Sequence, residues 1–268
     1  MKIAFIGGGN MGEAIISALL NKKLAGPEDI SVSDIAEARR DFLKKKYGIF
    51  VTASNKEAVA GKAVVVLAVK PQQMSEAFAD IKPVIKSAQL ILSIAAGVTI
   101  NTIKNGLAHD KIVRSMPNTP AQLGLGMTGW TATGAVTGEQ KKLAAKILGA
   151  MGKEIYFKDE SALDMVTAVS GSGPAYFYLF AENLIDAAVS IGLSRQDAEM
   201  LVKQTMLGAA QLVNQSDKTP AELRRNVTSK GGTTEQALKV FEESRLAKIA
   251  EKAVQAAWRR AIELGKAS

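Results

Sequence analysis

Residues 3–12 read Ile-Ala-Phe-Ile-Gly-Gly-Gly-Asn-Met-Gly, and this stretch decides the fold of the chain. The four apolar residues that open it end at a glycine, which is typical of a buried strand in a parallel sheet. The glycines fit the spacing G-x-G-x-x-G, in which Gly7 permits a tight turn, Gly9 lets the backbone approach a pyrophosphate, and Gly12 lets a helix pack closely on the strand. Apolar residues then recur at helical spacing over residues 10–23. This order of strand, glycine turn and helix predicts a dinucleotide-binding Rossmann unit, because the first turn of the helix directs its N–H groups at the phosphates.

Asp34 follows a second expected strand at residues 30–33, which read Ile-Ser-Val-Ser. In such units an acidic residue about 20 positions after the glycines meets the adenosine ribose, which favours the free 2′-hydroxyl of NADH. Arg39 and Arg40 follow one helical turn later and could reach the 2′-phosphate of NADPH instead. The expected cofactor is therefore NADPH or NADH, and the residues leave the preference open.

Further apolar runs alternate with helical patterns in the first half of the chain. We expect strands at residues 63–69, 90–94 and 111–116 and a helix at residues 36–47. After about residue 158 the pattern is helical, with long stretches at residues 174–190, 194–213 and 245–264. Alternating strands and helices predict a parallel sheet with right-handed crossovers. We therefore expect an α/β fold, with an N-terminal Rossmann parallel-sheet domain over residues 1–158 and an all-helical domain over residues 159–268, whose wide apolar faces favour burial in an oligomer.

The residue types that the chain lacks exclude several kinds of site. The 268 residues include no cysteine, so disulfides, thiolate nucleophiles and cysteine metal sites are excluded. The single histidine, His109, rules out a His-centred triad or a multi-His metal site within one chain, and we expect no metal. The polar neighbours of His109 predict a position in a solvated loop.

The charge and hydropathy of the chain bear on its partners. The net charge of +8 is spread along the sequence and aromatic residues make up 5% of it, so solvated helix faces explain the basic residues better than nucleic-acid binding does. No stretch reaches the roughly 18 to 20 apolar residues of a membrane span, and the start of the chain lacks the pattern of a signal peptide. We therefore expect a cytoplasmic protein with no membrane and no nucleic-acid partner.

Two kinds of loop contain further candidate binding residues. In open α/β sheets ligands bind at the carboxyl ends of strands. Lys70 lies at such an end, where it either contacts a phosphate or ribose of the cofactor or is an ordinary surface lysine. These strand ends lie at residues 68–71, 95–97 and 116–119. In the helical half, residues 170–176 and 226–235 combine glycines with hydroxyl residues before a helix. Such a loop offers N–H groups and hydroxyls to an anion such as a carboxylate, and the simpler alternative is an N-cap with a tight turn. Because two of them occur in a domain that must face a cofactor, we favour substrate binding.

Taken together, these segments resemble the pyrroline-5-carboxylate reductase family. The resemblance extends over essentially the whole chain and is most specific at residues 170–176 and 220–242. It implies hydride transfer from NAD(P)H to the cyclic imine (S)-1-pyrroline-5-carboxylate, which gives L-proline in proline biosynthesis. It also implies an interleaved homodimer, in which one chain's nucleotide domain meets its partner's loop. The larger assembly that it implies is a decamer built of dimers, a ring of ten chains. Family members are usually credited with a preference for NADPH and often have an arginine just after the second strand, where this chain has Asp34 and Ile35.

The glycine motif and the resemblance together define a set of candidate site residues. By the resemblance, Thr234 is the catalytic residue and donates a hydrogen bond to the imine nitrogen. The substrate-binding residues that it implies are Glu160, Asn226, Ser229, Gly231, Gly232, Thr233 and Thr234. The expected cofactor-binding residues are Gly7, Gly8, Gly9, Asn10, Met11, Gly12, Ser33, Asp34, Asn55, Ala68, Val69, Lys70, Pro71, Ala95 and Ala96.

Two other functions are compatible with a dinucleotide-binding chain. Imine reduction needs no metal and no strong base, only an oriented nicotinamide, a proton supply at nitrogen and an anchor for the carboxylate. A β-hydroxyacid dehydrogenase has a similar layout but needs a catalytic lysine on the helix after its central glycine cluster, and no lysine lies between Pro174 and Lys203. A dinucleotide sensor without catalytic activity has no use for two further hydroxyl-glycine loops. We therefore expect an NAD(P)H-dependent oxidoreductase.

Overall fold

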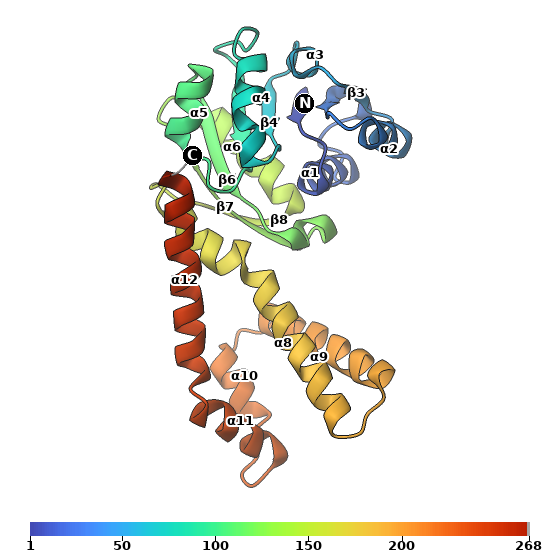
Figure 1. The fold of residues 1–268 in the computed structure, drawn as a ribbon, viewed down its shortest axis with the longest axis vertical. Coiled ribbons are helices and arrows are strands. Elements are labelled where there is room, and N and C mark those ends of the chain that lie inside the picture. The colour runs from blue at the N-terminus through green and yellow to red at the C-terminus, as the bar shows by residue number, and fades with distance from the viewer. Residues whose placement is uncertain (267–268) are drawn as a thin grey trace. The chain divides into compact units, whose positions relative to one another are not determined.

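The structure is a computed structural model that describes residues 1–266 (Figure 1). The contacts within the chain divide it into two units. One contains residues 1–172 together with the end of the chain from residue 257, and the other contains residues 173–256. We call these parts the sheet unit and the helical unit.

The sheet unit contains an eight-stranded sheet in the order β3-β2-β1-β4-β5-β6-β7-β8. Neighbouring strands are parallel except for β6 and β7, which are antiparallel. The strands are β1 (Ile3–Ile6), β2 (Ile30–Ser33), β3 (Phe50–Thr52), β4 (Val64–Leu67), β5 (Leu90–Ser93), β6 (Ile112–Met116), β7 (Gly126–Ala132) and β8 (Gly152–Tyr156). Because β1 lies between β2 and β4, the strand order reverses there, and open α/β sheets bind their ligands at this point.

The α/β class and the strands expected from the sequence are confirmed, but the sheet is larger than the sequence patterns indicate. These patterns do not predict β3, β7 or β8, and the antiparallel β7 corrects the expectation of a parallel sheet. β7 reads Gly-Met-Thr-Gly-Trp-Thr-Ala and β8 reads Gly-Lys-Glu-Ile-Tyr. Neither contains the continuous apolar run of a strand that is buried on both faces, which explains why they escape a search for such runs.

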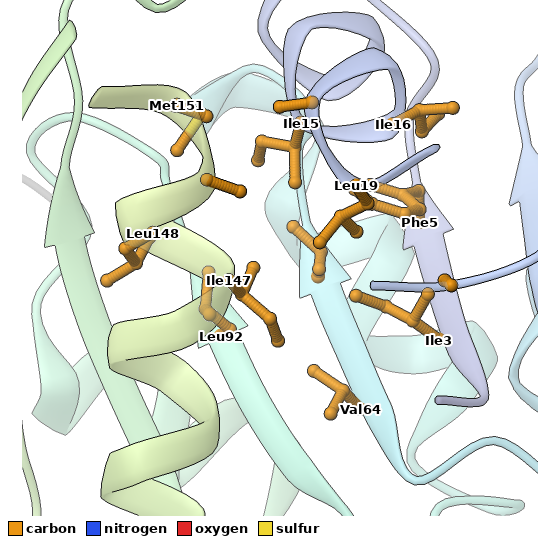
Figure 2. Packing of buried hydrophobic residues seen from close by; sticks show 14 of the residues in the cluster. Ile3, Phe5, Ile15, Ile16, Leu19, Val64, Leu92, Ile147, Leu148 and Met151 are labelled. Carbon is orange, nitrogen blue, oxygen red and sulfur yellow. The ribbon is translucent and has the colours of Figure 1, made fainter. Parts of the chain in front are cut away.

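Helices cover both faces of the sheet. α1 (Asn10–Asn21), α2 (Glu37–Tyr47) and α6 (Gly138–Leu148) contribute to the core on one face, and α3 (Asn55–Val59), α4 (Met74–Ile81) and α5 (Ile100–Leu107) to the core on the other. Alternate residues of β1 serve the two cores, Ile3 and Phe5 on one side and Ala4 and Ile6 on the other. Figure 2 shows the first core, where side chains of β1, β4 and β5 meet those of α1 and α6. Shorter helical elements are Pro27–Asp29, Pro71–Gln73, Thr119–Leu123, Gly149–Met151, α7 (Ala162–Val166) and the π-helical Thr167–Gly171.

The helices of the sheet unit begin either with or without a side chain that caps the first turn. Ser54, Thr99 and Thr137 accept a hydrogen bond from a first-turn N–H at the starts of α3, α5 and α6. α1, α2 and α4 have no such cap, and at α1 the N-cap is Gly9, which has no side chain. The first N–H groups of α1 are therefore available to an anion.

The helical unit contains α8 (Gly173–Ser190), α9 (Arg195–Gln215), α10 (Pro220–Asn226), α11 (Thr233–Glu243) and the first part of α12 (Leu246–Lys266). α8 and α9 pack against each other. Phe180 of α8 meets Phe241 of α11, with ring centroids 6.0 Å apart. The long helices expected at residues 174–190, 194–213 and 245–264 are confirmed, with bounds that differ by at most two residues.

His109 corrects one expectation about the sheet unit. Its side chain is buried, not solvated, and the ring atom Nε2 lies 2.8 Å from the carbonyl oxygen of Gln89. The chain leaves α5 through Ala108 in the left-handed region, at φ 50°, and this turn brings the ring against the segment before β5. The polar residues beside His109 mislead because the backbone turn, and not the polarity of the neighbours, sets the direction of the ring.

Candidate active site

The glycine loop after β1 has the geometry of a phosphate-binding turn. Gly7 has φ +96°, and its N–H donates to the carbonyl oxygen of Ser33 at 2.8 Å. A Cβ on Gly7 would lie 2.8 Å from the carbonyl oxygen of Ala68, and one on Gly12 would lie 2.8 Å from that of Gly7. A Cβ on Gly9, in contrast, would have no atom within 4 Å. Gly7 and Gly12 therefore permit close packing, whereas Gly9 leaves space open at the start of α1.

A pocket of about 330 Å³ lies beside this loop, at the carboxyl ends of β1, β2 and β4. It coincides with the reversal of strand order at β1, where this class of sheet binds nucleotides. The residues that line it are Gly7, Gly9, Ser33, Asp34, Ile35, Ala53, Asn55, Ala68, Val69, Lys70, Gln73, Glu76, Ala77 and Asp80. The structure thus brings together residues that are widely separated in the sequence.

The pocket contains part of the expected cofactor set. The expected residues that line it are Gly7, Gly9, Ser33, Asp34, Asn55, Ala68, Val69 and Lys70. Those that do not line it are Gly8, Asn10, Met11, Gly12, Pro71, Ala95 and Ala96. Four lining residues are not among those expected to bind the cofactor: Ile35, Ala53 and the α4 side chains Glu76 and Asp80. The sequence offers one indication of them, which is closeness along the chain to expected residues. Ile35 follows Asp34, and α4 comes shortly after the expected segment at residues 68–71.

Asp34 is fixed at the rim of the pocket by backbone donors. Its Oδ2 accepts from the N–H of Gly8 at 2.8 Å, and its Oδ1 accepts from the N–H of Ala36 at 2.9 Å. A carboxylate has about four acceptor positions, so two remain for another donor. Asp34 both orders the glycine loop and presents a negative charge to the pocket.

Arg39 and Arg40 are held by groups of the chain itself. Arg39 donates to the carbonyl oxygen of Gly8 through Nε and to the carboxylate of Glu13 through Nη2. Arg40 donates through Nη1 to the carbonyl oxygens of Asp34 at 2.8 Å and Ile35 at 3.1 Å. Neither arginine lines the pocket.

Glu13 of α1 is the centre of a small charged cluster. Its Oε1 accepts from the Nζ of Lys46 and from the hydroxyl of Tyr47, each at 2.9 Å, and its Oε2 accepts from Arg39. Desolvation by burial raises the pKa of Glu13, but the hydrogen bonds from Lys46, Arg39 and Tyr47 outweigh it and lower this pKa to about 2. Glu13 therefore remains ionised at neutral pH and keeps Arg39 in place.

Hydrogen bonds link three side chains that line the pocket. The hydroxyl of Ser33 donates to Oδ1 of Asn55 at 2.6 Å, and Nδ2 of Asn55 donates to Oδ2 of Asp80 at 2.9 Å. These two hydrogen bonds join the end of β2 to the start of α3 and, through Asp80, to α4. It orients the side chains of three elements around the same space.

Glu160 lies in the sheet unit and is bound to it. Its Oε1 accepts from the N–H of Ile100, in the first turn of α5, at 2.8 Å and from Nη1 of Arg114 at 2.6 Å. Arg114 is buried on β6, and Asp164 lies 3.9 Å from its second nitrogen. Desolvation by burial raises the pKa of Asp164 against the opposing effect of Arg114. The group joins β6, α5 and α7.

Two of the loops singled out in the sequence meet within the sheet unit. Nδ2 of Asn118, just after β6, donates to the carbonyl oxygen of Ser170 at 3.1 Å, and its Oδ1 accepts from the N–H of Met127 at 2.9 Å. Ser170 belongs to the π-helical turn that precedes α8. π-helical turns occur frequently at functional sites, which makes this turn consistent with the motif at residues 170–176.

The remaining candidate substrate residues lie in the helical unit, between α10 and α11. Gly231 has φ +74°, and its N–H donates to Oε2 of Glu235 at 2.8 Å. Gly232 is the N-cap of α11 and supplies no side-chain cap, so the first N–H groups of α11 are open as those of α1 are. The structure gathers Asn226, Ser229, Gly231, Gly232, Thr233 and Thr234 in this one loop and helix start.

Comparison with known proteins identifies the family. Residues 160–264 match the family model described as pyrroline-5-carboxylate reductase dimerisation, and residues 2–97 match the one described as NADP oxidoreductase coenzyme F420-dependent. A pyrroline-5-carboxylate reductase of Pseudomonas aeruginosa is 43% identical over 266 residues, which cover 99% of this chain and 97% of that protein. The chain belongs to the pyrroline-5-carboxylate reductase family.

Solved structures of pyrroline-5-carboxylate reductases have the same fold. The structure from Coxiella burnetii is 41% identical, with a TM-score of 0.91 and 98% of each chain covered. The structure of the Plasmodium falciparum enzyme, determined with NADP bound, is 32% identical, with a TM-score of 0.87, and covers 99% of this chain and 98% of its own. The resemblance predicted from the glycine motif and from the segments at residues 170–176 and 220–242 is thus confirmed.

None of the helices within residues 1–266 combines the length and apolarity that crossing a membrane requires. Over the same residues, no three His, Asp or Glu side chains come together as a metal-binding group.

Proposed function

We propose that this chain is a pyrroline-5-carboxylate reductase, which transfers a hydride from NAD(P)H to the imine carbon of (S)-1-pyrroline-5-carboxylate and yields L-proline. The observation that carries the proposal is the likeness to enzymes of this name, at 43% identity over nearly the full length of both chains. The pocket at the reversal of strand order adds a place for the cofactor. The enzyme is accordingly an NAD(P)H-dependent oxidoreductase that acts on a C=N bond.

The residues of the pocket fit a dinucleotide. The open space above Gly9 and the uncapped start of α1 suit a diphosphate, and the exposed Lys70 adds a positive charge. Ile35 exposes 81% of its surface at the rim, where an adenine ring would find an apolar face, and Asp34 would accept a hydrogen bond from the ribose. When bound, the reduced nicotinamide supplies the hydride. The expected cofactor residues outside the pocket, such as Ala95 and Ala96 after β5, belong to the same proposal on the strength of the family resemblance.

The substrate residues act through hydrogen bonds. Ser229, Gly231, Gly232 and Thr233, with Asn226, hold the substrate carboxylate and ring, and the open N–H groups at the start of α11 support this role. The hydroxyl of Thr234 donates a hydrogen bond to the ring nitrogen, which gains a proton from solvent as the imine carbon gains the hydride. Glu160 is included as a further site position by resemblance, and its ion pair with Arg114 holds its carboxylate in one place.

The proposal extends to domains, assembly and location. Residues 1–158 form the dinucleotide-binding domain, and residues 159–268 form the dimerisation and substrate-binding domain. The chain forms a homodimer, whose interleaved helical domains bring one chain's loop to its partner's nucleotide domain, and a decamer built of such dimers is the larger assembly. The match of residues 160–264 to a dimerisation model supports the dimer. A chain without cysteine suits the reducing cytoplasm, where we expect the enzyme to work.

The test is a turnover assay with purified full-length protein. Pyrroline-5-carboxylate and either NADH or NADPH are mixed, the loss of the reduced cofactor is followed at about 340 nm, the absorption band of the reduced nicotinamide, and proline is measured as the product. We expect loss of the cofactor that depends on the imine and is matched by proline formation. A β-hydroxyacid with the oxidised cofactor is the control for the rival dehydrogenase. Cofactor binding without any turnover of the imine would favour the sensor and overturn the proposal.

A further inference from the structure

We propose that this chain binds NADH in preference to NADPH, because acidic side chains surround the 2′ position of the dinucleotide pocket and both nearby arginines are engaged elsewhere. The inference rests on the dinucleotide binding proposed above. It concerns the choice between NADH and NADPH that the sequence leaves open. The evidence comes from the charged side chains near the end of β2 and from their hydrogen bonds.

Asp34 is the first of these side chains. Backbone donors at Gly8 and Ala36 hold its two oxygens at 2.8 and 2.9 Å, so the carboxylate cannot swing away without leaving two N–H groups unpaired. Its remaining acceptor positions suit the hydroxyls of an adenosine ribose. A 2′-phosphate in the same place would bring a charge of about −1.5 to −2 against a fixed negative charge.

Two side chains of α4 add to the negative potential of the pocket. Glu76 and Asp80 of α4 line the same pocket, and Asn55 holds Asp80 in place through its hydrogen bond to Oδ2. Among the described residues that line the pocket, Lys70 alone is cationic. Three carboxylates and one ammonium group make this end of the pocket unfavourable for an added phosphate.

The arginines that could offset this charge are already bound. Arg39 would have to leave both the carbonyl oxygen of Gly8 and the carboxylate of Glu13, which stays ionised because its pKa is about 2. Arg40 would have to leave the carbonyl oxygens of Asp34 and Ile35. Each move would leave acceptors of the chain unpaired, so neither arginine is free to form the bidentate pair that phosphate recognition requires.

The experiment measures equilibrium binding without substrate. The full-length protein is titrated by calorimetry with NADH and, separately, with NADPH at low ionic strength. We expect the Kd for NADH to be at least about tenfold below that for NADPH. The variant Asp34→Asn keeps the size of the side chain and one backbone acceptor but removes the charge, so the ratio of the two Kd values should narrow, chiefly through tighter binding of NADPH.

A second variant and a matched control separate charge from loop structure. The double variant Glu76→Gln with Asp80→Asn changes α4 and leaves the hydrogen bonds of Asp34 intact, and it should narrow the ratio as well. Glu139→Gln on α6 removes one exposed charge that does not line the pocket, and it should leave the ratio unchanged. Circular dichroism and thermal melting establish that each variant is folded, and the α4 variant decides the question if Asp34→Asn does not fold.

The outcomes distinguish this inference from the proposed function on which it rests. Equal affinity for the two cofactors, or tighter binding of NADPH by the unmodified protein, overturns the NADH preference and leaves the dinucleotide site standing. A failure to bind either cofactor overturns the dinucleotide site itself. A preference for NADH that neither charge variant alters shows that the side chains named here do not cause it.

Discussion

Glu13 connects the phosphate-binding turn to the helix that follows β2. It accepts hydrogen bonds from Lys46 and Tyr47 of α2, and also from Arg39, which in turn donates to the carbonyl oxygen of Gly8. These contacts are local to the sheet unit and need no ligand. They make the ionisation of one carboxyl group a measurable contribution to the stability of the glycine loop.

We expect Glu13→Gln to destabilise the protein at neutral pH by about 2 kcal/mol, after allowance for screening by solvent. The pKa of Glu13 is lowered from 4.5 to about 2, so its contribution is fully present above pH 4.5 and is lost as the pH falls towards 2. Urea unfolding at pH 7 and at pH 3 measures the difference between the two proteins. Glu139→Gln is the control. A penalty for Glu13→Gln that is the same at both pH values would contradict the assignment.

Thr234, at the start of α11, is the proposed hydrogen-bond donor to the ring nitrogen. Removal of its hydroxyl by Thr234→Ala should lower kcat by about a hundredfold, which is typical of the loss of one hydrogen-bond donor to the reacting group, and should leave the Kd of the reduced cofactor unchanged. Thr234→Ser retains the hydroxyl and should recover most of the activity. Steady-state kinetics and calorimetry on the three proteins measure both quantities. An equal loss of activity in the alanine and serine variants would point to packing of the methyl group instead.

Gly7 and Gly9, in the turn from β1 into α1, have different structural roles. Gly7→Ala should destabilise the protein by about 1–3 kcal/mol, because the residue has φ +96° and the new Cβ would meet the carbonyl oxygen of Ala68. Gly9→Ala should leave stability within about 0.5 kcal/mol of the original, since the new Cβ meets no atom of the chain.

The two glycine variants should also differ in cofactor binding. The Cβ of Gly9→Ala enters the space that the diphosphate needs, so we expect the Kd of the dinucleotide to rise by at least about tenfold. Urea unfolding and calorimetric titration, applied to both variants, compare stability with affinity. If Gly9→Ala binds the cofactor as the original protein does, the phosphates do not approach the backbone at this position.

The strands that frame the pocket were predictable because they are buried on both faces. β1 and β4 are short apolar runs, and β2 alternates isoleucine and valine with serine. A glycine, a lysine-proline pair and an aspartate respectively follow these strands and mark their carboxyl ends. β3 has three residues and is partly exposed, and β7 contains two glycines. Such strands depend on pairing with a neighbour, which no local pattern records.

The contents of the pocket were predictable only in part. Gly9, Asp34 and the segment that begins at Ala68 follow from the motif, because a strand end must point its next residues at the ligand. Glu76 and Asp80 depend on how α4 packs beside β4. The engagement of Arg39 with Glu13 joins residues that are distant in sequence, and only the packed structure reveals it.

The helical unit exposes apolar side chains that a stable monomer would bury. Phe177 and Leu184 of α8 and Leu201 and Met206 of α9 line one groove of about 840 Å³, and Phe177 exposes 66% of its surface. Large exposed apolar patches mark interaction surfaces in soluble proteins. The groove lies within the residues that match the dimerisation model, so a second copy of the chain is the expected occupant.

We therefore expect Leu184→Glu to prevent assembly. A carboxylate in an apolar interface loses its hydration without gaining a partner, which costs several kcal/mol per site, and a symmetric dimer contains the site twice. Light scattering coupled to size exclusion should give the unmodified protein a mass of at least two chains of 28.4 kDa, and ten chains if the decamer forms. Leu184→Glu should reduce this mass to that of one chain. Leu123→Glu, at an 80% exposed leucine of the sheet unit, is the matched control and should assemble normally. An unmodified protein with the mass of one chain, or a Leu184→Glu variant that assembles fully, would show that the groove is not the contact between copies.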